Sequence, residues 1–167
     1  AEVTRKEWLI LVVIGIIGYY FASFLDFWGL QYIGAGIERL ILFLYPTMTV
    51  ILGAVILKKK VSWVQVLAIV IAYIGISIAF WDQLFIEQNA NFWLGASLVF
   101  ASALTFSFYL IGSDKIIPKL GVLKFTSYCM VISCVVVILH YNLVSVTEIM
   151  SFPWQAHLLG FLVAIFN

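Results

Sequence analysis

The chain has 167 residues, of which 65% are hydrophobic and only 10% are charged, and its mean hydropathy is +1.15. Because a soluble domain is about 45–50% apolar and about 25% charged, this composition excludes an ordinary water-soluble domain and predicts a protein that lies in lipid. The net charge is only +1, and the run of three lysines at 58–60 is too short for a nucleic-acid-binding patch.

Apolar runs follow one another along the chain, and about 20 apolar residues span the core of a bilayer. We expect five spanning helices and the start of a sixth, at residues 8–33, 37–57, 61–81, 92–112, 121–141 and 154–167. The last run reaches only about 21 Å at a rise of about 1.5 Å per residue, so we expect the chain to be a piece of a longer protein. The predicted fold class is an all-α membrane protein, a multi-pass transmembrane helix bundle.

The basic residues alternate between the connections of these runs. Eight of the nine precede the first run or lie between runs two and three or four and five: Arg5, Lys6, Lys58, Lys59, Lys60, Lys115, Lys119 and Lys124. The opposite connections hold Asp82, Glu87 and Glu148 and no Lys or Arg. Because cytoplasmic loops are rich in Lys and Arg, we expect the N-terminal side to be cytoplasmic and the protein to lie in the cell membrane.

Three ionisable residues, Asp26, Glu38 and Arg39, lie close to the small-residue turn at 34–36. Each costs about 2.5–3.5 kcal/mol on insertion scales. Counted from this turn, Asp26 and Arg39 are offset by about four residues, or about 6 Å, which predicts an ion pair, with Glu38 pointing about 100° away. Three interpretations stay open: a static pair that fixes the hairpin, the charged wall of a substrate pathway, or snorkelling to the interface without a partner.

Pro46 interrupts the second run, removes a backbone N–H and frees the carbonyl of Leu42. In lipid this carbonyl needs a donor or water, and Tyr45 and Thr49 lie near it in sequence. The proline either makes a simple kink, or it bends a helix that widens a central cavity or flexes during transport.

The fourth run has a stripe of small and hydroxyl-bearing residues at a spacing of four, with Ser102 beside it: Ser97, Ala101, Thr105 and Tyr109. Such a stripe allows close helix packing, or it lines a wet cavity. We expect Arg39, Tyr45, Ser102 and Tyr109 to border one cavity. The predicted substrate-pathway residues are Asp26, Glu38, Arg39, Tyr45, Pro46, Thr49, Ser102, Thr105 and Tyr109.

No residues are spaced as a hydrolytic triad, a phosphate-binding glycine loop, an HExxH zinc site or a CxxC pair. We therefore expect no enzyme, no cofactor and no metal site. His140 ends the fifth run and is expected to lie at the membrane interface, with a proton relay as the alternative.

The segments LQYIGAGIERLILFLYPT (30–47) and KKKVSWVQVLAIVIAYIGISIAF (58–80) resemble the EamA-like repeat of the drug/metabolite transporter superfamily. They share its small residues, its mid-helix proline, its basic helix end and the aromatic start of the next helix. The resemblance implies ten helices in two inverted repeats of five. Residues 1–81 would be the C-terminal part of the first repeat and 92–167 the N-terminal part of the second, so the chain would hold helices three to eight.

This resemblance implies a secondary transporter that moves small metabolites by alternating access, with a proton as a candidate coupling ion and the lipid bilayer as its surroundings. The fixed charge of Arg39 suits a carboxylate, which favours amino acids or related compounds. The alternatives are a scaffolding membrane protein without a pathway and, third, a membrane enzyme. The insertion cost of the charged residues argues against a scaffold.

Overall fold

The computed structural model describes residues 4–79, 81, 90–144, 153–155, 158–159 and 161–162, without the side chain of Lys6. The chain divides into two units, Ala1–Ser133 and Cys134–Asn167, and every site discussed below lies in the first. The predicted acidic connections with Asp82, Glu87 and Glu148 lie outside the described residues, as does most of the run 154–167. His140 belongs to the second unit, where its interfacial role stays a prediction.

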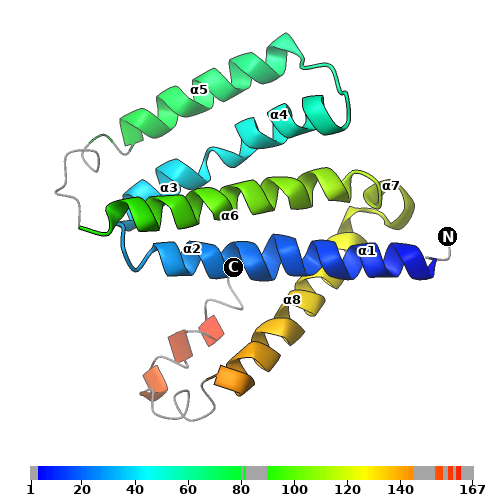
Figure 1. The fold of residues 1–167 in the computed structure, drawn as a ribbon, viewed down its shortest axis with the longest axis vertical. Coiled ribbons are helices and arrows are strands. Elements are labelled where there is room, and N and C mark those ends of the chain that lie inside the picture. The colour runs from blue at the N-terminus through cyan, green and yellow to red at the C-terminus, as the bar shows by residue number, and fades with distance from the viewer. Residues whose placement is uncertain are drawn as a thin grey trace. The chain divides into compact units, whose positions relative to one another are not determined.

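Helices make up the regular structure of the described part (Figure 1). They are α1 (Arg5–Gly15), the π-helical segment η1 (Ile16–Phe21), α2 (Ala22–Gly29), α3 (Ala35–Leu42), α4 (Tyr45–Ile56), α5 (Trp63–Ala79), α6 (Phe92–Ser113), α7 (Ile117–Leu120) and α8 (Val122–Val144). Within the described residues, and counted across η1 and across the two residues between α3 and α4, four helical stretches are long and apolar enough to cross a membrane: Glu7–Gly29, Ala35–Ile56, Phe92–Ser113 and Val122–Val144. The predicted all-α, multi-pass membrane protein is therefore confirmed.

The helix α5 begins at Trp63, two residues after the start of the spanning helix expected at 61–81, and it is described as far as Ala79. Its surface is almost wholly apolar and exposed, and the hydroxyls of Thr47 on α4 and Tyr73 on α5 lie 2.6 Å apart. This hydrogen bond holds α5 against α4 where lipid supplies no hydrophobic force between helices.

The helix α6 is the centre of the bundle and contacts α1, η1, α2, α3 and α4 (Figure 1). Within its apolar window 39% of the residues are buried, against 6% in Ala35–Ile56. The buried residues of α6 are small from Gly95 to Ser107, and larger ones follow toward its end: Gly95, Val99, Ser102, Ala103, Ser107, Tyr109, Ile111 and Ser113. Of the predicted stripe, Tyr109 is buried and Ala101 and Thr105 are partly buried, whereas Ser97 is exposed and bonds to the carbonyl of Leu94 in its own helix.

Glycines allow the first helical stretch to lie directly on α6. A Cβ atom on Gly29 would sit 2.5 Å from Val99 Cγ2 and 2.9 Å from the carbonyl oxygen of Gly95. A Cβ atom on Gly95 would in turn lie 3.0 Å from the carbonyl oxygen of Gly29. The two backbones therefore touch at a glycine pair, the close approach that small residues make possible between membrane helices.

The predicted run 8–33 is not helical to its end. The helix stops at Gly29, and residues 30–33 form a turn that leads to α3. Inside the helical part, η1 replaces one α-helical turn by a wider π-helical one, a local irregularity that often occurs at functional sites. Sequence patterns did not predict η1.

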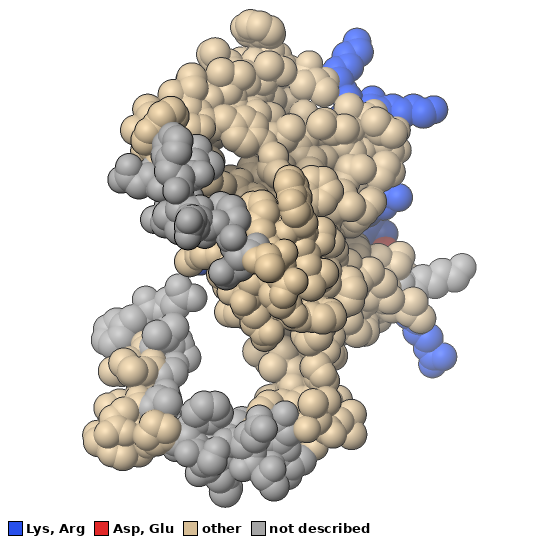
Figure 2. All heavy atoms as spheres, turned by 60° about the vertical axis from the view of Figure 1, so that its left-hand side comes forward, with Lys and Arg blue, Asp and Glu red and all other residues tan. Residues whose placement is uncertain are grey.

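One end of the bundle collects the basic residues. The start of α1, the α4–α5 connection and α7 lie at the same end in Figure 1. In the described part of this end, Lys119 of α7 pairs with Glu7 of α1, and Lys59 of the α4–α5 connection pairs with Asp114 at the end of α6. Figure 2 shows the Lys and Arg side chains along one side of the molecule, while the rest of that face is almost wholly uncharged. This arrangement suits a bundle with one end in water beside anionic headgroups.

Candidate functional site

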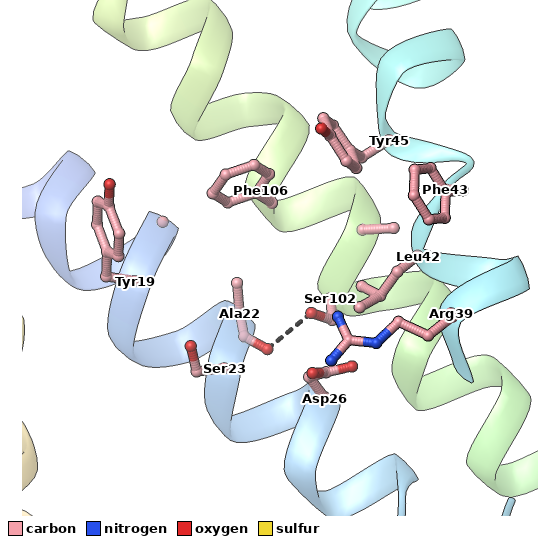
Figure 3. Close-up of a pocket in the computed structure, with 12 residues that line it drawn as sticks. Tyr19, Ala22, Ser23, Asp26, Arg39, Leu42, Phe43, Tyr45, Ser102 and Phe106 are labelled. Carbon is pink, nitrogen blue, oxygen red and sulfur yellow. Dashed lines mark hydrogen bonds between the residues drawn. The ribbon is translucent and has the colours of Figure 1, made fainter. Parts of the chain in front are cut away.

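A pocket with a volume of about 360 Å³ lies between η1, α2, α3, α4 and α6 (Figure 3). Its wall includes four of the predicted pathway residues, Asp26, Arg39, Tyr45 and Ser102. The other labelled side chains around it are Tyr19, Ala22, Ser23, Leu42, Phe43 and Phe106. The pocket therefore has one charged end and otherwise apolar, aromatic and hydroxyl-bearing walls.

The charged end differs from the predicted pairing. Arg39 Nε lies 3.3 Å from Glu38 Oε2, and among the described residues this is the ion pair that Arg39 forms within 4.0 Å. The guanidinium points toward Asp26 across the pocket (Figure 3) without forming the expected Asp26–Arg39 pair at that distance. Glu38, which was expected to point away, is the buried member: its side chain is 1% exposed, against 63% for Arg39.

The reason lies in the helix ends. Counting from the centre of the turn at 34–36 assumed that both helices reach it. In the structure α2 ends at Gly29 and α3 begins at Ala35, so Asp26 and Glu38 each stand three residues inside their helix. Glu38 is therefore at the depth of Asp26, and Arg39 lies a third of a turn further round the helix.

The carboxyl groups of Asp26 and Glu38 interact with each other, and both interact electrostatically with the positive charge of Arg39. One oxygen of each, Asp26 Oδ1 and Glu38 Oε1, is buried and has no hydrogen-bond partner in the described part of the chain. Buried polar atoms normally have a hydrogen-bond partner, so each of these two oxygens lacks a donor that a buried oxygen would be expected to have.

Aromatic rings form the opposite wall of the pocket. Tyr45 meets Phe106 edge-on with ring centroids 5.4 Å apart. Phe106 stacks on Tyr109 at 5.4 Å, and Tyr109 touches Tyr19 edge-on at 5.1 Å. Tyr109 does not line the pocket itself; it is 6% exposed and supports the lining rings from behind.

At the predicted proline kink, two residues, Phe43 and Leu44, form a short break between α3 and α4 inside the stretch Ala35–Ile56, with both backbones still in the right-handed helical region. α3 ends at Leu42, and α4 begins at Tyr45 with Pro46 in its first turn, the position where a missing N–H costs least. Ser107 Oγ lies 3.1 Å from the carbonyl oxygen of Tyr45. Thr49 Oγ1 also donates to the Tyr45 carbonyl oxygen, at 2.7 Å, rather than to Leu42.

Two further predicted pathway residues lie away from this pocket. Thr49 lines a second pocket, also about 360 Å³, that reaches the basic end at Lys59 and Asp114. Thr105 Oγ1 donates to the carbonyl oxygen of Ala101 in its own helix, at 2.6 Å. Neither side chain is brought to the charged end.

Sequence reasoning missed Tyr19, Ser23 and Phe106. A signal for the first two was present, because Tyr19, Ala22, Ser23 and Asp26 follow the spacing i, i+3, i+4 and i+7 of one helix face. Their polar groups on a membrane helix mark that face as one that avoids lipid. Phe106 has no such signal among the apolar residues of α6.

Residues 1–81 match the EamA-like transporter family. An uncharacterized transporter of Synechocystis sp. is 32% identical over 131 residues, which are 76% of this chain and 38% of that protein. The chain belongs to the EamA-like transporter family. The uncharacterized transporter YyaM of Bacillus subtilis is similar as well, 32% identical over 133 residues, which are 78% of this EamA-like chain and 43% of YyaM. No solved structure matches the chain.

The EamA-like chain spans less than half the length of these two relatives. The family match ends at residue 81, and the assignment of residues 92–167 to a second repeat stays a prediction. Among the residues that the structure describes, no group of three or more His, Cys, Asp or Glu could hold a metal ion. Chemically, the pocket offers one exposed guanidinium, a carboxyl group, hydroxyls and aromatic faces, groups that can bind a small polar molecule.

Proposed function

We propose that the protein is a secondary transporter that moves small metabolites across the cell membrane by alternating access, and that the pocket of Figure 3 is part of its substrate pathway. The observation that carries this proposal is the position of Arg39: a guanidinium on a membrane helix, 63% exposed, at the wall of a pocket. An ionisable residue at such a place is a functional candidate because its insertion is costly.

The pairing of Arg39 supports a pathway over a static clamp. Its ion pair within 4.0 Å is with Glu38, the preceding residue of the same helix, and its charge acts on Asp26 of α2 without a direct pair. A charge that only fixed the hairpin would pair across it. The guanidinium instead keeps donors free for a ligand, and its planar fork binds carboxylates in a bidentate way. We therefore favour amino acids or related carboxylates as substrates.

Two further features fit alternating access. The two-residue break between α3 and α4 is a local interruption of a membrane helix beside the pocket, and interrupted helices are common in transporter sites. The ion-paired basic end fits a cytoplasmic N-terminal side by the positive-inside rule, with the charged end of the pocket toward the opposite side. The second repeat, with α6 as its first helix, would complete the site at a repeat interface.

The test is transport by the full-length protein in proteoliposomes, across a panel of amino acids and other carboxylates. Loss of a hydrogen bond to a charged group costs about 1.5–3 kcal/mol, which is roughly 10- to 150-fold in affinity. Arg39→Ala should reduce transport at low substrate concentration by at least tenfold, and Arg39→Lys should restore only part of it because the fork geometry is lost.

Lys124→Ala is the matched control, since it removes one cation outside the pocket. Asp26→Asn and the double variant with Arg39→Ala separate transport from stability, and every rate is normalised to folded protein. Wild-type transport by folded Arg39→Ala contradicts the proposed pathway. A folded wild-type protein that transports nothing from a broad panel would favour the scaffolding alternative.

A further inference from the structure

The carboxyl pair, Asp26 and Glu38, lies in a membrane-spanning region and is not balanced in charge. Two carboxylates face one guanidinium, that of Arg39. The other titratable side chains at the adjoining pocket are Tyr19 from η1 and Tyr45 from α4, and α6 contributes Ser102, whose hydroxyl donates to the carbonyl oxygen of Ala22 at 2.7 Å. With both carboxyls ionised, Asp26, Glu38 and Arg39 together would carry a net negative charge, and a net charge inside the membrane is energetically costly.

The carboxyl pair also lacks a hydrogen-bond donor. Asp26 Oδ1 and Glu38 Oε1 are both buried without a partner, and the Glu38 side chain is 1% exposed. An ionised carboxylate can only accept hydrogen bonds, whereas a protonated one carries an O–H donor. The site therefore lacks one donor and one positive charge, and a single proton supplies both.

We propose that the carboxyl pair is a proton-binding site in which Asp26 and Glu38 share one proton. One carboxyl takes a proton from water, its O–H donates to the oxygen of its neighbour, and the net charge of the pair with Arg39 falls to zero. A sodium ion would balance the charge as well. It would not supply the hydrogen-bond donor that the two buried oxygens lack, whereas a proton would, so the chemistry of the site favours a proton.

The site adjoins the pocket, because Asp26 lines it and Arg39 joins the two. An anionic ligand that draws Arg39 away from Glu38 removes a positive neighbour from the carboxyl pair and so strengthens its hold on the proton. Carboxylate and proton would then bind together, which makes the pair a coupling site. This consequence rests on the proposed transport function, whereas the shared proton does not.

The test of the shared proton needs no substrate. Infrared spectroscopy of the full-length protein in liposomes near neutral pH should show the C=O stretch of a protonated carboxylic acid. Both Glu38→Gln and Asp26→Asn should abolish it. Glu7→Gln is the matched control, because Glu7 is paired with Lys119 at the opposite end, and it should leave the band unchanged. A band that is absent, or that survives both substitutions, overturns the proposal.

Stability against pH provides a second readout. If the folded state holds a proton that the unfolded chain releases, stability falls as pH rises. The wild type should therefore become less stable as the pH is raised. In Glu38→Gln the amide N–H replaces the shared proton as donor, so the stability of this variant should depend less on pH. Stabilisation by sodium chloride but not by potassium chloride, without a protonated-carboxyl band, would assign the site to sodium instead and overturn the proton.

Discussion

Gly18 lies where η1 packs against α6, and the structure leaves no room for a methyl group there. A Cβ atom on Gly18 would sit 2.3 Å from Cγ and Cδ2 of Tyr109 and 2.5 Å from its Cβ. These atoms are the root of the side chain, and no rotation moves the Cβ. The ring is also held in place, since it stacks between Phe106 and Phe125 with centroids 5.4 and 5.9 Å away. Relief of the clash therefore requires the two helices to separate.

The cost of Gly18→Ala follows from this geometry. Overpacking of a core costs about 1–3 kcal/mol, and a contact of 2.3 Å with immobile atoms belongs at the upper end, about 3 kcal/mol. Alanine is the better helix former by about 1 kcal/mol. We therefore expect a net loss of about 2 kcal/mol, roughly a thirtyfold decrease in the ratio of folded to unfolded protein.

The assay is unfolding of the full-length protein in mixed micelles, with increasing SDS and circular dichroism as the signal. Gly75→Ala and Gly112→Ala are matched controls. The space around Gly75 is empty within 4 Å, and a Cβ on Gly112 meets Ile14 Cδ1, the movable end of a side chain, at 2.8 Å. Gly75→Ala should be neutral or slightly stabilising, and Gly112→Ala should lose less than Gly18→Ala. A Gly18→Ala variant as stable as Gly75→Ala would refute the reasoning.

Two further outcomes follow from the packing and the charge pattern. Ser102→Ala removes the interhelical hydrogen bond to the Ala22 carbonyl and should lower the free energy of unfolding by about 0.6 kcal/mol, at most about 1.7. The control Ser97→Ala loses only a hydrogen bond within its own exposed turn and should change the free energy of unfolding by less than about 0.5 kcal/mol. Equal losses in the two variants would contradict the contact between Ser102 and Ala22. In cysteine labelling of intact cells, Lys59→Cys should be protected from an impermeant reagent and Glu87→Cys labelled; the opposite result would reverse the topology.

Composition and charge were sufficient to predict the class of fold and the order of the helices. Runs of apolar residues define membrane helices because lipid satisfies no backbone polar group, and this constraint holds whatever the neighbours are. The sequence also predicted that Arg39, Tyr45, Ser102 and Tyr109 would border one cavity; the first three line the pocket, whereas Tyr109 does not.

Register was the part that the sequence could not supply. Whether residues 30–33 are helix or turn decides which of Glu38 and Arg39 is level with Asp26, and an apolar pattern is the same in both cases. The sequence also did not indicate which face of α6 packs against the first helical stretch. Gly95, Val99 and Ser102 lie on that face because they contact Gly29 and Ala22. Such choices depend on tertiary neighbours that no local pattern encodes.

The break between α3 and α4 has an electrostatic consequence for the pocket. In an unbroken membrane helix the ends of the macrodipole lie near the two membrane surfaces. Here α3 ends at Leu42 and α4 begins at Tyr45, and Pro46 has no N–H to offer the Leu42 carbonyl, so a backbone carbonyl dipole lies within the low-dielectric slab. Leu42, Phe43 and Tyr45 are pocket residues. Part of the polarity at this wall of the pocket therefore comes from backbone groups. Substituting the side chains of these pocket residues would not remove it as long as the break remains.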